Sequence, residues 1–249
     1  MISNLICSWA LIAAVPCSAR AQCYERLEEL CQCGSAKPLL DVLDSLEQSM
    51  GLDTAISCSA EEMLARELVA DYWTRHLSLT WMTTSKKRQR MELWLVTGKD
   101  HIVQWCIASG DKVRDVRIDT TLFERMNTVF RTVYERELEP WELFQSLTTR
   151  YGKVCGYAGA PPEERSLLED MVAKHDVQGL NKWLGSPTAE LQLYAFEGLL
   201  RMRADGYMLT PFQERCIKTI RKKKGAVSTC SGCIVSKSQI ASVLSETDR

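Results

Sequence analysis

Residues 91–118 have the sequence MELWLVTGKDHIVQWCIASGDKVRDVRI, and this stretch decides the fold class. Three short apolar runs, at residues 91–96, 101–107 and 113–118, are separated by the turn sequences GKD and SGD. Glycine reaches the positive φ angles that tight turns between antiparallel strands require. The stretch therefore predicts a small three-stranded antiparallel meander.

The chain on both sides of this meander has helical spacing. Ser59 and Glu62 form a capping-box pattern, which predicts a helix from residue 59 to about residue 77. Residues 120–139 carry a broad apolar stripe and stop at Pro140, so they predict a helix that covers one face of the meander. Two more short helices are expected within residues 24–50.

The second half of the chain has the capping residues, prolines and glycines that are typical of a helical region. Residues 151–160 contain three glycines and precede a proline pair, which predicts a linker. Beyond it, capping residues and prolines predict helices over residues 163–174, 177–184, 187–202 and 211–223. The expected fold is a predominantly helical α+β protein, with an α+β domain at 22–150, the linker, and a helical domain at 161–249.

Within this region a short helix, a Ser-Pro turn and a longer amphipathic helix follow one another. The residues that define the pattern are Asp176, Leu180, Trp183, Leu184, Ser186, Pro187, Glu190, Tyr194, Ala195, Glu197, Gly198 and Leu199. Residues 176–204 thereby resemble one unit of a HEAT-like helical repeat, which implies a protein-contact scaffold. The chain also resembles uncharacterised secreted bacterial proteins that end in a similar Cys-Ser-Gly-Cys segment, a resemblance that implies no activity.

The N-terminus predicts export. Residues 5–15 are apolar but too few to span a membrane, and Ala19-Arg20-Ala21 fits the pattern that signal peptidase cleaves. We therefore expect a signal peptide at residues 1–21 and a mature chain that starts at Gln22. No later stretch approaches 18 consecutive apolar residues, so the mature chain is expected to have no transmembrane segment and to be secreted or periplasmic.

Cysteine usage agrees with export, because nine of the 11 cysteines would remain and disulfides form in oxidising compartments. Cys230 and Cys233 predict either structural disulfides that tie the tail to the body or a redox-active pair. The pair follows a basic run rather than opening a helix after a strand, which favours the structural interpretation. A tetrathiolate zinc site of Cys31, Cys33, Cys230 and Cys233 is a third interpretation.

Other features point to no specific chemistry. The chain lacks a Gly-x-Ser-x-Gly elbow, a His-Glu-x-x-His motif and a glycine-rich phosphate loop, and its histidines at positions 76, 101 and 175 are isolated. The tryptophans are interpreted mainly as core residues, and Trp94 and Trp105, on neighbouring predicted strands, are where a sugar-stacking platform would be sought. The basic run at residues 221–224 is interpreted as ordinary surface.

Composition narrows the class of protein. The chain has 249 residues, 45% hydrophobic and 25% charged, which excludes a disordered or collagen-like chain. Its formal charge of -1 argues against a nucleic-acid partner. The sequence therefore predicts an exported, disulfide-stabilised binding or structural protein without a cofactor, whose partner is another protein or a cell-envelope component. The alternative is a thiol-disulfide oxidoreductase that uses Cys230 and Cys233.

Overall fold

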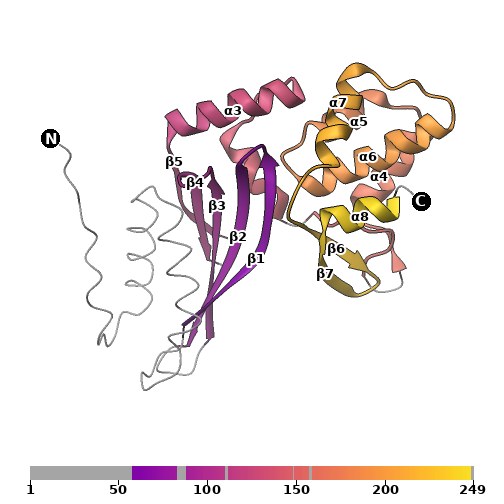
Figure 1. The fold of residues 1–249 in the computed structure, drawn as a ribbon. Coiled ribbons are helices and arrows are strands. Elements are labelled where there is room, and N and C mark those ends of the chain that lie inside the picture. The colour runs from indigo at the N-terminus through magenta and orange to yellow at the C-terminus, as the bar shows by residue number, and fades with distance from the viewer. Residues whose placement is uncertain (1–57, 83–87, 110–111, 148, 157–158, 248–249) are drawn as a thin grey trace.

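The computed structural model describes residues 58–82, 88–109, 112–147, 149–156 and 159–247. The expected signal peptide at 1–21 and the two expected helices within 24–50 lie outside these residues. The described chain forms a five-stranded sheet, then helices, and then a β-hairpin followed by a last helix (Figure 1). The α+β class is thereby confirmed. Among the described residues, no helix is both long enough and apolar enough to cross a membrane.

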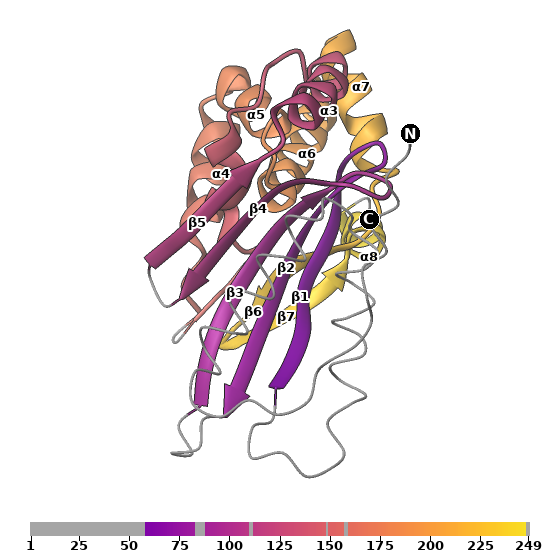
Figure 2. The same ribbon diagram turned by 90° about the vertical axis from the view of Figure 1, so that its left-hand side faces the viewer.

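The sheet is an antiparallel meander in which every strand pairs with the next one along the chain. Figure 2 shows it with β1 at one edge and β5 at the other. The three predicted strands are confirmed, but the meander has five strands instead of three. The bounds are β1 Cys58–Val69, β2 Tyr72–Met82, β3 Arg88–Thr97, β4 Ile102–Ser109 and β5 Lys112–Ile118.

The helix predicted for residues 59–77 is wrong, because β1 and β2 occupy this stretch. The two strands meet at a tight turn in which Asp71 has a φ of 64°. β1 has register shifts between Glu62 and Leu64 and between Glu67 and Val69. Each shift breaks the two-residue alternation of a strand, so the apolar residues fall at distances that imitate a helix.

Seven apolar side chains of β2, β3 and β4 form one buried face of the sheet. They share one side by register, and each is at least 96% buried. They are Leu77, Leu79, Met91, Leu93, Leu95, Trp105 and Ile107. Helix α3 (Thr120–Tyr134) contacts β1 and β4, and it ends at a left-handed Glu135 rather than at the predicted residue 139.

The helical region agrees closely with the prediction. It contains α4 Glu163–Ala173, α5 Val177–Leu184, α6 Ala189–Ala204 and α7 Pro211–Ile220. The predicted capping box of Thr210 and Gln213 is present at α7. Helix α6 begins later than expected, because Thr188 occupies the cap position and the Ser186 hydroxyl accepts a hydrogen bond from its backbone N–H at 3.1 Å.

The C-terminal segment contains a β-hairpin that the sequence did not predict. Strands β6 (Ala226–Ser231) and β7 (Ile234–Gln239) are joined by a two-residue turn, and α8 (Ile240–Thr247) follows them. Gly232 opens the turn with a φ of 57°, as a tight hairpin requires. Side chains from the sheet, α3, α6, the hairpin and α8 belong to one hydrophobic core, for example Leu68, Phe130, Phe196, Val227 and Leu244. The predicted division at residues 151–160 stays a prediction.

A buried amine lies in this core. Lys223 follows α7, and its Nζ donates a hydrogen bond to Oε1 of Gln192 at 2.6 Å. The surface interpretation of the basic run is therefore wrong for this residue, which is 5% exposed. Burial, and then the positive charge of Arg66, lower the pKa of the Lys223 ammonium to about 7.

Stability should consequently rise above neutral pH in a way that depends on Lys223. Between pH 7 and the ordinary lysine pKa near 10.4, the unfolded chain keeps a proton that the folded chain has lost. Relative to Lys223→Met, the wild type should gain roughly 1–2 kcal/mol of unfolding free energy between pH 7 and pH 9. Urea denaturation at several pH values measures this gain, and a constant difference between the two proteins would contradict a buried neutral amine.

Candidate functional site

The hairpin belongs to a layer of three extended segments. Residues 151–156 run parallel to β6 on the side away from β7. The backbone N–H of Tyr151 donates to the Ser228 carbonyl at 2.8 Å, and that of Cys230 donates to the Tyr151 carbonyl at 3.1 Å. Further along, the Gly232 N–H donates to the Val154 carbonyl at 3.0 Å. The segment expected to be a linker therefore holds the hairpin in place.

A disulfide fixes this layer covalently. It joins Cys155 to Cys230, whose Cα atoms are 5.3 Å apart and whose positions are 75 residues apart in the chain. The predicted structural disulfide between tail and body is thus present, and Cys230 is bonded to Cys155 rather than to Cys233. Cys233 lies in the hairpin turn with an exposed free thiol. The oxidoreductase alternative, which needs both members of the pair, stays a prediction.

Gly152 leaves no room beside the disulfide. A Cβ atom at this position would overlap the Cys230 carbonyl oxygen and approach its sulfur at 2.8 Å. The Gly152 N–H donates to the Tyr194 hydroxyl at 3.0 Å, and that hydroxyl donates to the Arg150 carbonyl at 2.9 Å. The backbone of this segment is thereby held against both β6 and α6.

Gly152→Ala should therefore lower the free energy of unfolding by about 1–3 kcal/mol, because its Cβ forces the strand away from β6. Thermal and urea denaturation would measure the loss. Ser242→Ala is the control. Ser242 lies on the exposed side of α8, so this change should alter the free energy of unfolding by less than about 0.5 kcal/mol. Gly206→Ala is less suitable, because Gly206 has a positive φ. Equal stability of Gly152→Ala and wild type would contradict the close approach.

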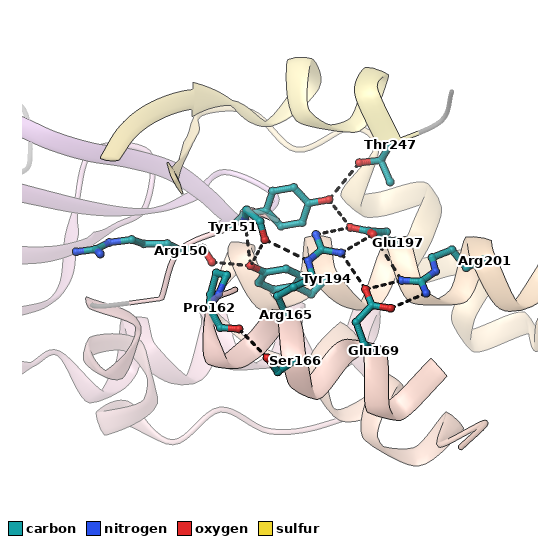
Figure 3. A network of polar contacts seen from close by, with 11 residues as sticks. Arg150, Tyr151, Pro162, Arg165, Ser166, Glu169, Tyr194, Glu197, Arg201 and Thr247 are labelled. Carbon is teal, nitrogen blue, oxygen red and sulfur yellow. Dashed lines mark hydrogen bonds and ion pairs between the residues drawn. The ribbon is translucent and has the colours of Figure 1, made fainter. Parts of the chain in front are cut away.

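An ion pair joins this layer to the helices (Figure 3). Arg165 of α4 and Glu197 of α6 form a two-pronged contact, with nitrogen–oxygen distances of 2.5 and 2.8 Å. The Arg165 Nε donates to the Gly152 carbonyl at 3.1 Å, and the Tyr151 hydroxyl donates to Glu197 at 2.7 Å. Beside the Arg165–Glu197 pair, Glu169 of α4 pairs with Arg201 of α6.

The electrostatics of this network suit a structural role. Burial alone would raise the pKa of Glu197, but hydrogen bonds from Arg165 and Tyr151 outweigh it and hold that pKa below its usual range. Burial raises the pKa of Tyr151, and it raises the pKa of Tyr194 to about 12. None of these three groups therefore has its pKa near 7, where general acid–base catalysis at neutral pH would need it.

The outer edge of the hairpin is open. The register pairs Ser231 with Ile234 across the two-residue turn, so alternate residues of β7 direct their backbone groups away from β6. These residues are Val235, Lys237 and Gln239. Within the described part of the chain, no backbone hydrogen bond satisfies their outward N–H and C=O groups. Every residue of β7 except Ser238 is exposed.

Three apolar residues at or beside the tip of the same hairpin are exposed. Ile234 is 70% exposed and Val235 is 53% exposed. Val154, whose carbonyl binds the turn, is 41% exposed. Ile234 and Val235 are consecutive in a regular strand, so their side chains lie on opposite faces of the hairpin, and exposed apolar groups on a rigid element can take part in a contact. We call these three residues and the open edge of β7 the hairpin surface.

The zinc hypothesis, which involves Cys230 and Cys233, stays a prediction. Cys31 and Cys33 of the zinc hypothesis lie outside the described chain, within which no three metal-ligating side chains come together. Trp94 lies directly opposite Cys106, the residue next to Trp105, and Trp105 lies opposite Leu95. Since paired residues share a face and consecutive residues alternate, the two tryptophan rings lie on opposite faces of the sheet and cannot form one platform. His76 stacks on Trp94, with the two ring centroids 3.5 Å apart, and contacts Glu92. The other two histidines are exposed.

Sequence reasoning missed the hairpin surface and the Arg165–Glu197 pair. The pair joins positions 32 residues apart and leaves no local pattern. Comparison of the chain with protein-family models, with curated proteins and with solved structures gave no match.

Proposed function

We propose that the protein is an exported, disulfide-stabilised binding protein whose contact surface is the hairpin surface. The observation that carries the proposal is the combination of an open strand edge with exposed apolar side chains on a covalently fixed layer. The disulfide and the backbone bonds of residues 151–156 order this layer before any partner arrives. Less conformational entropy is then lost on binding, and this favours affinity.

The chemistry of the edge favours a polypeptide as the partner. Outward N–H and C=O groups alternate along β7 at the spacing of an extended chain, and a partner strand can satisfy all of them. A cell-envelope polymer without a backbone of that spacing would satisfy only a few. Export is supported by the apolar N-terminal run, its cleavage pattern and a disulfide of the kind that oxidising compartments maintain.

A photo-reactive residue at position 234, incorporated into the exported protein in living cells, tests the contact surface. The matched control carries the same residue at position 208, which is 85% exposed and lies between α6 and α7. We expect a covalent adduct of defined mass from position 234 and none from position 208. No adduct from position 234, or the same adducts from both positions, would overturn the proposal.

A further inference from the structure

We propose that the hairpin surface binds a second copy of this chain, through antiparallel pairing of β7 with β7 of the second copy around Ser236. This inference rests on the proposed contact surface and names its partner. It begins with the backbone: Val235 and Lys237 both direct their N–H and C=O groups outward, one on each side of Ser236. A two-fold axis at Ser236 therefore places Val235 of one copy opposite Lys237 of the other. The outward N–H and C=O groups of both residues are then hydrogen-bonded across the interface.

The edge lacks the features that keep strands from associating. β7 contains no proline and its pairing with β6 shows no bulge. Its one charged residue, Lys237, is exposed, but its Nζ donates to the Glu62 carbonyl at 2.8 Å and lies 3.8 Å from a Glu61 carboxylate oxygen. The charge that would repel a second strand is thus directed toward β1.

The side chains are complementary in this register. Ile234 of one copy lies opposite Ser238 of the other, and Val235 lies beside the aliphatic stem of Lys237. The two lysines are diagonal neighbours rather than directly opposite, and each has its own acidic neighbour. Each of the two most exposed apolar residues of the hairpin thereby gains a cross-strand neighbour on its own face of the strand.

Pairing of two six-residue strands buries a small area, so the dimer should be weak and concentration-dependent. The resulting sheet would run without interruption from residues 151–156 of one copy, through both hairpins, to the same segment of the other. This arrangement converts the two open edges into interior strands.

Position 236 provides a direct test. In the proposed register, the two Ser236 residues face each other as a non-hydrogen-bonded pair, whose Cα separation of about 4.5 Å suits a disulfide. Ser238→Cys is the matched control. The hydroxyl groups of Ser236 and Ser238 both lie 2.9 Å from that of Thr229, but in the proposed register Ser238 faces Ile234 of the second copy rather than its own equivalent. Both cysteine substitutions are made together with Cys233→Ser, which removes the exposed thiol of the hairpin turn.

With oxidised glutathione as the oxidant, Ser236→Cys should give about tenfold more disulfide-linked dimer than Ser238→Cys, measured by intact mass under non-reducing conditions. Equal yields, or no dimer from Ser236→Cys, would overturn the inference. If the photo-adduct from position 234 then contained a different protein, the contact surface would stand and only the second copy would be excluded.

Val235→Pro gives an independent readout. Proline removes the outward N–H of this residue and leaves the hydrogen bonds between β6 and β7 intact, since position 235 makes none of them. Sedimentation velocity over a range of concentrations should show association for the Cys233→Ser protein and its loss on adding Val235→Pro, at an unchanged thermal midpoint. A monomer at every concentration without Val235→Pro, or equal association with it, would contradict edge pairing.

Discussion

Replacement of Arg66 by methionine should lower the free energy of unfolding by about 3–5 kcal/mol. Arg66 lies on β1 and donates to the carboxylate of Glu190 on α6, and both side chains are almost fully buried. Glu190 also accepts a hydrogen bond from the Ser228 N–H of β6 at 2.8 Å. Loss of the guanidinium leaves a buried carboxylate without its cation at the point where sheet, helix and hairpin meet.

Urea denaturation at pH 7 measures this loss. Arg75→Met provides the control, because Arg75 pairs with Glu62 at the surface, where an ion pair contributes about 0–1 kcal/mol. Combining Arg66→Met with Glu190→Met should recover part of the lost stability, because the double change removes the unpaired charge. If Arg66→Met and Arg75→Met lowered the free energy of unfolding equally little, the buried Arg66–Glu190 pair would not be what joins the sheet to the helices.

Removal of the Cys155–Cys230 disulfide should have a comparable effect. The bond closes a loop across 75 positions, and the loss of such a constraint on the unfolded chain lowers stability by about 4 kcal/mol. Changing both cysteines to alanine avoids leaving Cys230 free to react with Cys233. Thermal and urea denaturation of this double variant give the stability, and amide hydrogen exchange reports on the hairpin.

Cys233→Ser is the matched control, since it removes an exposed thiol that forms no disulfide. We expect it to change stability by less than about 0.5 kcal/mol. In the double-alanine variant, exchange should accelerate first in β6 and β7, because the helices keep their own core contacts. Unchanged stability together with unchanged exchange in the hairpin would refute the role assigned to the disulfide.

The sequence predicted elements whose signals are local. The capping box at Thr210 and Gln213 located the start of α7, because both hydrogen bonds form within four residues. The turn sequences at residues 98–100 and 109–111 predicted the separation of β3, β4 and β5 for the same reason. In β1 the same kind of local pattern misled, because two register shifts gave a strand the spacing of a helix.

Features that depend on distant partners could not be predicted. The sequence indicated disulfides, but the choice of Cys155 for Cys230 depends on residues 151–156 lying beside β6. Arg165 and Glu197 meet only because α4 packs on α6. The hairpin was missed because its turn, Gly232 and Cys233, was interpreted as part of a cysteine motif rather than as a turn.

The hairpin surface combines these long-range features. Buried polar contacts hold residues 151–156, the disulfide attaches β6 to that segment, and β7 is left as the outermost strand. The hairpin is therefore a rigid, covalently fixed part of the molecule.

The most direct test of this rigidity is the cysteine map of the protein isolated from its native compartment, acid-quenched and alkylated before reduction. Peptide mass spectrometry should find Cys155 and Cys230 in one disulfide-linked peptide pair and Cys233 already alkylated. A bond between Cys230 and Cys233, or free thiols at both Cys155 and Cys230, would contradict a covalently fixed hairpin.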